Sequence, residues 1–149
     1  MEKRLEIYTD GGARGNPGPA ACAFTIIKNG KIIYQYAKKI GWQTNNVAEY
    51  SGILEALKFL SQNKNYYYGF SEIFFKSDSQ LIVNQLNARY KIKNKKLQTL
   101  IIQIKNLEKT LDIKIYYDIV SRLRNQKTDT LINQILDDFH NNFLEKIFS

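Results

Sequence analysis

The spacing of the hydrophobic residues changes at Asn45, and this change does most to limit the possible folds. Before Asn45, short apolar and β-branched runs are separated by turns, and Asn29-Gly30 is a typical hairpin turn. After Asn45, most apolar residues recur at the three- and four-residue spacing of amphipathic helices, with two further strand-like runs between them. The predicted order is three strands, a helix, a strand, two helices, a strand and a helix.

This order predicts an α/β fold with a five-stranded mixed sheet and helices on both faces. The first three strands form an antiparallel meander, and the fourth and fifth arrive through helical crossovers, which makes them parallel to the first. Asn45 or Asn46 is expected to cap the first helix, residues 11–19 and 121–127 are expected to be loops, and one domain is expected over residues 1–149. The expected strands cover residues 5–10, 20–27, 32–40, 72–78 and 113–120, and the expected helices begin near residues 45, 81, 97 and 131.

Charge and composition narrow the class of protein. The chain has 22 Lys and Arg against 14 Asp and Glu, a formal net charge of +8, which points to a polyanionic partner. A single cysteine excludes a disulfide framework. No apolar run is long enough for a membrane span and no signal peptide is visible, so a cytoplasmic protein without membrane contact is expected.

Two acidic side chains come at the ends of predicted parallel strands: Asp10 after the first and Asp78 after the fourth. Neighbouring strands lie about 4.8 Å apart, so the two carboxylates can point into one pocket if these strands pair. Glu49, early in the first helix, and Asp129, at the start of the last, are best placed to join them. Four carboxylates with no Cys or His nearby favour Mg²⁺ or Mn²⁺ over zinc. Taken singly, each of these acids is more often a turn or helix-cap residue.

Four motifs resemble, in order, the signatures of type 1 ribonuclease H. They are Tyr8–Ala20 (YTDGGARGNPGPA), Thr44–Tyr50 (TNNVAEY), Ser77–Gln80 (SDSQ) and Asn125–Asp129 (NQKTD). The resemblance covers about residues 5–135, and four ordered matches are far more specific than any one of them. It implies a ribonuclease H-like fold. A monomer is expected, although the sequence itself does not say how many chains assemble.

The resemblance also implies an activity: hydrolysis of the RNA strand of an RNA/DNA hybrid, leaving 5′-phosphate and 3′-hydroxyl ends. It implies two Mg²⁺ ions, with Mn²⁺ as a substitute, because paired ions stabilise the entering and departing oxygens of an in-line displacement. Asp10 would bridge both ions, and Asp129 would hold the ion that generates the attacking hydroxide. Glu49 and Asp78 would hold the ion on the leaving 3′-oxygen.

Further positions match hybrid-binding residues of the family. Asn16, Asn45 and Gln80 match positions that contact 2′-hydroxyls, to which an amide can both donate and accept. Without the resemblance, Asn16 reads as a turn residue and Asn45 as a helix cap. Thr44 and Asn46 are expected to bind a phosphate of the DNA strand. The expected substrate-binding residues are Gly11, Gly12, Arg14, Asn16, Thr44, Asn45, Asn46, Gln80, Lys93, Asn94, Lys95, Arg122 and Arg124.

The chain departs from the family pattern in two places. Many members have a larger basic protrusion between two helices; here the connection is compact, and hybrid affinity is expected to rest on the basic stretch 89–96, which would otherwise be a solvated face. Many members also have a histidine in the loop before the last aspartate, and residues 120–127 contain none. Arg122 or Arg124 is expected to supply positive charge there, without transferring protons. The single histidine, His140, is expected at the surface or edge of the last helix.

Two other functions stay open at this point. One is a binding module that keeps the groove but does not cleave, against which the complete set of four carboxylates argues. The other is a nuclease of the same fold that acts on another duplex, such as RNA/RNA; competition between matched duplexes would separate it from the first reading. Trp42 is also open, since it can stack on a bound hybrid or pack against the sheet edge.

Overall fold

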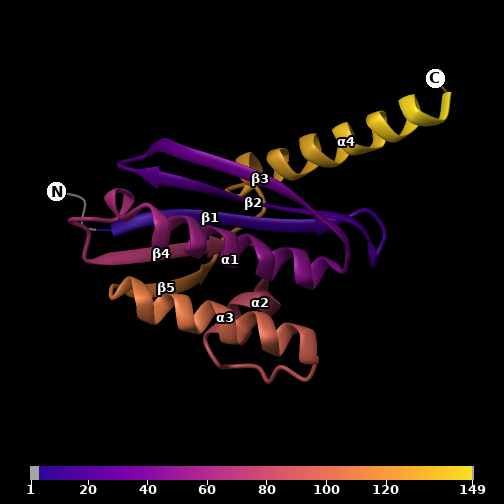
Figure 1. Ribbon diagram of the computed structural model, residues 1–149. Helices are drawn as coiled ribbons and strands as arrows, with labels where there is room; N and C mark the ends of the chain where they lie inside the picture. The colour runs from indigo at the N-terminus through magenta and orange to yellow at the C-terminus, as the bar shows by residue number, and fades with distance from the viewer. Residues whose placement is uncertain (1–3, 149) are drawn as a thin grey trace.

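The computed structural model describes the backbone of residues 4–148 and the side chains of residues 4–138. This part of the chain contains a five-stranded sheet in the order β3-β2-β1-β4-β5 (Figure 1). β1 (Arg4–Ala13), β2 (Gly18–Lys28) and β3 (Lys31–Gln43) are antiparallel neighbours, whereas β4 (Glu72–Ser77) and β5 (Lys114–Ile119) run parallel to β1. The predicted mixed sheet is confirmed, including the pairing of the first and fourth strands.

The helices lie on both faces of this sheet, as the sequence predicts. α1 (Asn45–Gln62) packs on β1, β2 and α3 (Lys95–Leu111), and the short α2 (Gln80–Leu86) contacts β4 and β5. α4 (Gln126–Phe148) contacts β1, β2 and β3. A 3₁₀ turn at Lys64–Tyr66, which the sequence pattern does not predict, follows α1. Among the described residues, no helix is both long enough and apolar enough to cross a membrane.

The strand alternation of β2 explains why both sheet faces are covered. Phe24 and Ile26 point into the main core together with residues of α1, α2 and α3, whereas Ala21 and Ala23 pack against Ile132 of α4 and its neighbours. Large side chains therefore fill the space under α1, and small ones let α4 lie close to the sheet. The tyrosine hydroxyl of the fully buried Tyr50 donates to Gln85 Oε1 at 2.6 Å, which ties α1 to α2.

Two glycines set the distance between β1 and α1. A Cβ on Gly11 of β1 would lie 2.1 Å from the backbone of Ala48, and a Cβ on Gly52 of α1 would lie 2.6 Å from the carbonyl oxygen of Asp10. Neither distance leaves room for a side chain, so backbone meets backbone here. This contact places Glu49, the residue after Ala48, beside Asp10.

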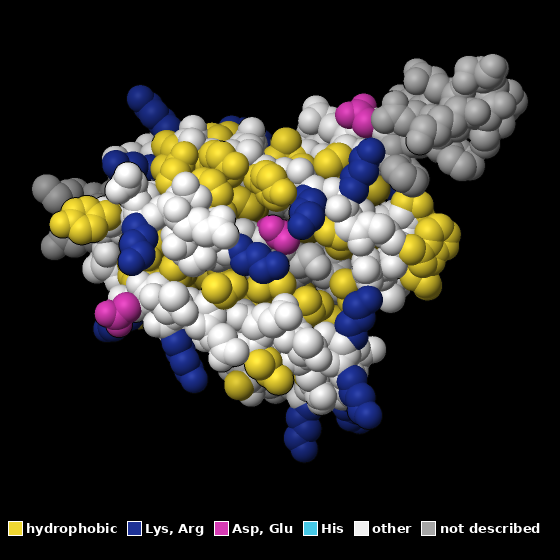
Figure 2. All heavy atoms as spheres, viewed as in Figure 1, with side chains coloured by type: hydrophobic (Ala, Val, Ile, Leu, Met, Phe, Trp, Pro, Cys, Tyr) yellow, Lys and Arg dark blue, Asp and Glu magenta, His cyan; other side chains and the backbone are white. Residues whose placement is uncertain are grey.

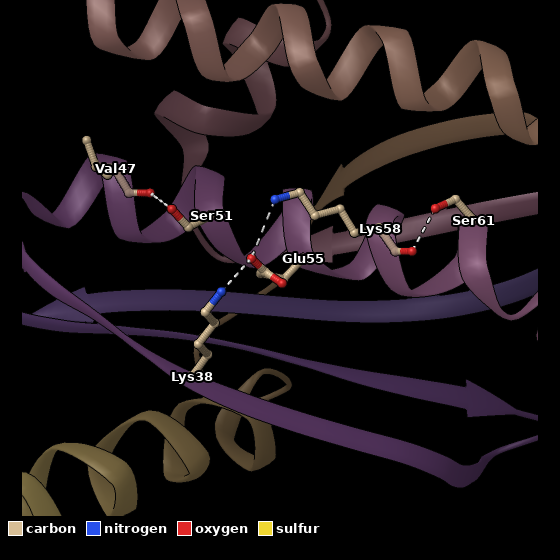
Figure 3. A network of polar contacts seen from close by, with 6 residues as sticks. All are labelled: Lys38, Val47, Ser51, Glu55, Lys58 and Ser61. Carbon is tan, nitrogen blue, oxygen red and sulfur yellow. Dashed lines mark hydrogen bonds and ion pairs between the residues drawn. The ribbon is translucent and has the colours of Figure 1, made fainter.

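Charged side chains join α1 to the sheet edge at the surface. Glu55 of α1 lies 3.3 Å from Lys38 of β3 and 3.9 Å from Lys58 of its own helix (Figure 3). Pairs this exposed contribute little to stability. Figure 2 shows this side of the molecule, on which Lys and Arg are spread widely while Asp and Glu are few. Several basic side chains project where Figure 1 draws α3 and the connection before it.

Three boundary predictions are wrong. Thr44, not Asn45 or Asn46, caps α1: its backbone is extended and its hydroxyl accepts from the Val47 N–H at 3.2 Å. β1 does not end at Asp10, because its ladder with β2 continues to Ala13 opposite Ala20. The loop before α4 ends earlier than the expected residue 127, because α4 begins at Gln126. The Asp129 N–H already donates to the carbonyl of Asn125.

We expect Gly52→Ala to lower the free energy of unfolding by about 1–3 kcal/mol, measured by urea denaturation. Alanine favours a helix over glycine by about 1 kcal/mol, but the clash with the Asp10 carbonyl outweighs that gain. Ser51→Ala on the same helix is the control and should change stability little, since Ser51 only donates to its own helix at Val47. Unchanged or increased stability of Gly52→Ala would show that the contact tolerates a methyl group.

Candidate active site

Four carboxylates from different elements line one cavity of about 570 Å³. Asp10 comes from β1, Glu49 from α1, Asp78 from the residue after β4, and Asp129 from the first turn of α4. The cavity lies where the parallel strands end, which is where α/β sheets commonly bind ligands. Its other lining residues are Gly11, Asn45, Arg122, Leu123 and Gln126.

Asp10 is the most enclosed of the four acids. It is 8% exposed, and its Oδ1 accepts from the Gly11 N–H at 2.9 Å. Burial, followed by the charge of Asp78, raises the pKa of Asp10 from 3.8 to about 8, and Asp129 is close enough to share a hydrogen bond with it. The surroundings of Asp10 therefore disfavour its ionised form, because they supply too little positive charge.

Glu49 has an oxygen without a partner. Its Oε2 is buried and accepts no hydrogen bond among the described residues. Burial is the largest effect on this side chain and raises the pKa of Glu49 to about 7, although a hydrogen bond with Ser79 opposes the rise. Buried carboxylate oxygens are normally satisfied, so the Oε2 atom is available to a cation or a hydrogen-bond donor that enters the cavity.

Asp78 is placed by the turn from β4 into α2. Ser79 caps α2 by accepting from the Ile82 N–H, and its own N–H donates to Ser77 Oγ at 3.1 Å. Burial raises the pKa of Asp78, and the nearby charge of Arg122 opposes this rise. Arg122 thus lies on the side of the cavity formed by Asp78.

The loop between β5 and α4 is fastened to the sheet. The side-chain amide of the fully buried Asn125 donates to the carbonyl of Thr9 at 3.0 Å, next to Asp10. The Val120 N–H donates to the carbonyl of Ser77 at 2.9 Å, which continues the pairing of β5 with β4 up to the residue before Asp78. Arg122 and Leu123 therefore stand on a segment anchored at both ends beside the carboxylates.

The residues present fit a hard divalent cation. All four acidic groups offer oxygen, the donor that Mg²⁺ and Mn²⁺ prefer. The unpartnered Glu49 Oε2 and the raised pKa values of Asp10 and Glu49 fit a site that a cation would stabilise. Among the described residues, no three acidic, cysteine or histidine side chains are already gathered as a ligand set.

A second cavity of about 440 Å³ lies next to the first. Thr44 and Asn46 at the start of α1 line it together with Asn16, Trp42 and the start of α3. Asn16 and Asn45 connect the walls of the two cavities, because Asn16 Oδ1 accepts from the Asn45 N–H at 3.0 Å. Trp42 is 69% exposed and is not packed into the sheet edge.

The structure divides the expected substrate-binding residues. Gly11, Asn45 and Arg122 line the first cavity, and Asn16, Thr44, Asn46 and Asn94 line the second. Gly12, Arg14, Gln80, Lys93, Lys95 and Arg124 line neither.

Two of the residues outside the cavities have partners elsewhere. Arg14 turns to α4, where it pairs with Asp137 at 2.5 Å, and Arg124 donates to the hydroxyl of Tyr8 at 3.4 Å. Gln80, Lys93 and Lys95 are exposed. The side chain of His140 lies outside the described residues.

Sequence reasoning missed other lining residues. Lys96, rather than Lys93 or Lys95, lines the second cavity, where its Nζ donates to Gln43 Oε1 at 2.5 Å. Asn94, a good helix cap, was a signal for where α3 begins, but it does not distinguish Lys95 from Lys96, which are both in the first turn. Nothing in the sequence marked Leu123 as a lining residue of the first cavity, apart from its place between Arg122 and Arg124.

Comparisons with known proteins give one family. The model of the reverse transcriptase-like family matches residues 8–135. Ribonuclease HI of Halobacterium salinarum is 33% identical over 91% of this chain and 65% of its own length. A bifunctional protein of Mycobacterium tuberculosis is 34% identical over 90% of this chain, which spans 36% of that relative. The chain thus spans less than two thirds of either curated relative.

A solved structure extends this likeness to three dimensions. LC11-RNase H1, isolated from compost and solved in complex with an RNA/DNA hybrid, superposes with a TM-score of 0.81 at 34% identity. The match covers 87% of this chain and 94% of that one. The matched length, the sheet order and the ordered motifs agree, and the chain belongs to the type 1 ribonuclease H family.

Proposed function

We propose that this protein is an endoribonuclease that hydrolyses the RNA strand of RNA/DNA hybrids and leaves 5′-phosphate and 3′-hydroxyl ends. The observation that carries the proposal is the convergence of Asp10, Glu49, Asp78 and Asp129 on one cavity. The solved relative bound to an RNA/DNA hybrid supports the choice of substrate. Residues 1–149 would act as one catalytic domain, and we propose a monomer in the cytoplasm, where the single, buried Cys22 stays reduced.

The family depends on metal ions, and we propose two Mg²⁺ ions here, with Mn²⁺ as a substitute. Asp10, the central acid, would contribute to both sites, Asp129 to one, and Glu49 and Asp78 to the other. Such ions, when bound, activate water and stabilise charge on the entering and leaving oxygens of the phosphodiester.

Residues of the chain itself place the acidic side chains and supply a positive charge beside them. Asp10 stands on β1 and Glu49 on α1, and the two glycines set the close spacing of these backbones, which fixes where the two side chains start. Arg122 places a permanent positive charge beside Asp78, where it would stabilise negative charge on the scissile phosphate. An arginine stays protonated at neutral pH and would not carry protons.

The second cavity would hold the substrate away from the reaction. Thr44, Asn46 and Lys96 supply hydroxyl, amide and ammonium donors suited to a backbone phosphate, and Trp42 offers an exposed ring beside them. The basic stretch 89–96 continues from this cavity and contains no acidic residue. Contacts of this kind bind without reading sequence and weaken as salt rises.

The primary test is cleavage of an end-labelled RNA/DNA hybrid in Mg²⁺, in EDTA, and with Asp10→Asn. We expect the wild type to cut only the RNA strand, and both EDTA and the substitution to abolish cutting, because Asn keeps the size of Asp10 but removes its charge. Matched RNA/RNA and DNA/DNA duplexes serve as competitors. A hybrid that is bound but stays whole in Mg²⁺ and Mn²⁺ would favour the binding module instead.

The metal-free protein should lose stability as pH rises. The folded pKa of Asp10, about 8, exceeds its unfolded value of about 4, so its stabilising contribution is complete below pH 4 and is lost as pH rises through 8. In EDTA we expect the melting temperature to fall by roughly 5 °C between pH 5 and 8.5. Asp10→Asn should reduce this fall without abolishing it, because the raised pKa of Glu49 contributes to it as well, and Mg²⁺ should reduce it further. A fall that is equally large in Asp10→Asn would assign it to other groups.

Arg122 and Arg124 should differ in kinetics. Arg122→Ala is expected to lower kcat by about tenfold to a hundredfold with a smaller effect on KM, because its charge faces the cavity. Arg124→Ala is the matched control and should keep kcat within a few fold, since its guanidinium is directed to Tyr8. Steady-state kinetics on one hybrid decides between them, and equal kcat losses would refute the distinction.

A further inference from the structure

Leu123 is the apolar side chain in an otherwise polar cavity. The residues around it are the four carboxylates, Gly11, Asn45, Arg122 and Gln126, yet Leu123 is 79% exposed. An exposed leucine on a protein surface is ordinary. A leucine at the rim of a cavity that holds four acids is within reach of any molecule whose phosphate reaches those acids.

The leucine is also held in place. Asn125 fixes the following backbone to Thr9, and the Arg124 N–H donates to the carbonyl of Ser121 at 3.1 Å. The Gln126 N–H donates to the carbonyl of Leu123 itself at 3.4 Å. The tight turn presents the side chain outward at little entropic cost on binding, because its backbone is already ordered.

The neighbours of Leu123 indicate what it meets. Arg122 lies beside Asp78 and lines the same cavity as Leu123, so one cation and one apolar side chain are adjacent at the rim, while Arg124 is directed away to Tyr8. A nucleic acid strand presents a matching pair of groups, because the C–H atoms of each sugar lie next to a phosphate. Resting on the proposed function, we propose that Leu123 packs against the sugar of the nucleotide at the scissile phosphate and so helps to position the strand.

This contact would be made equally in the ground state and the transition state, because the sugar does not react. Its loss should therefore raise KM and leave kcat nearly unchanged. It should also be independent of base sequence, since sugars are the same at every position. No charge is removed, so the dependence of binding on salt concentration should stay the same.

The test compares Leu123→Ser with Leu123→Met on two hybrids of different sequence. We expect Leu123→Ser to lower kcat/KM by roughly five- to tenfold through KM on both hybrids, and Leu123→Met to stay within about twofold of the wild type. In an Asp10→Asn background with Mg²⁺, fluorescence anisotropy should show the same loss of hybrid affinity and the same salt slope. The melting temperature should not change, because Leu123 is exposed.

Tyr68→Ser is the control, since Tyr68 is 85% exposed and lies beside Glu72 and Lys114 at the opposite ends of β4 and β5. If Leu123→Ser behaves like Tyr68→Ser in both assays, the sugar contact is wrong while the proposed function stands. The same holds if Leu123→Ser lowers kcat/KM by different factors on the two hybrids. If the wild type does not cleave, the proposed function fails. The anisotropy comparison then still decides whether Leu123 contacts the strand.

Discussion

The close contact of α1 with β1 determines most of what lies around the candidate site. Gly11 and Gly52 remove the side chains that would otherwise keep the two backbones apart, so the first turns of α1 lie directly on the strand that carries Asp10. A helix and a sheet usually meet through side chains, which leaves some freedom in their spacing. A backbone contact removes that freedom, and Glu49 gains a fixed place because its helix cannot approach or withdraw.

Electrostatics at the site oppose the stability of the fold that builds it. Asp10 is buried and Glu49 half-buried near other acids, and their raised pKa values show that the protein alone does not compensate their negative charges. Groups in this condition are expected at functional sites, where a ligand supplies what the fold lacks. The exposed Arg122 offsets part of the negative charge of these acids. The negative charge that it does not offset is the physical reason to propose divalent cations here.

Sequence patterns predicted the convergence of the acids because parallel strands end at one edge, so Asp10 and Asp78 needed only adjacent strands to meet. The patterns could not place side chains whose direction depends on tertiary packing. Arg14 belongs to a motif but turns to Asp137 on α4, a residue 123 positions away. Lys96 enters the second cavity ahead of Lys95 because the buried Leu97 sets the rotation of α3. Strand ends were also misjudged, since the ladder partner of residues 11–13 lies in β2.

The bonding of Asn16 and Asn45 limits what this rim of the site can recognise. The Oδ1 of Asn45 accepts from the Ala13 N–H at 2.9 Å, and that of Asn16 accepts from the Asn45 N–H. A backbone N–H requires an oxygen opposite it, so each amide has one defined orientation, with one lone pair of its Oδ1 in use and its NH₂ group turned away from that contact. Both asparagines therefore act as directional donors. In the proposed complex, a 2′-hydroxyl that meets either NH₂ group accepts from it and directs its own hydrogen to an acceptor elsewhere.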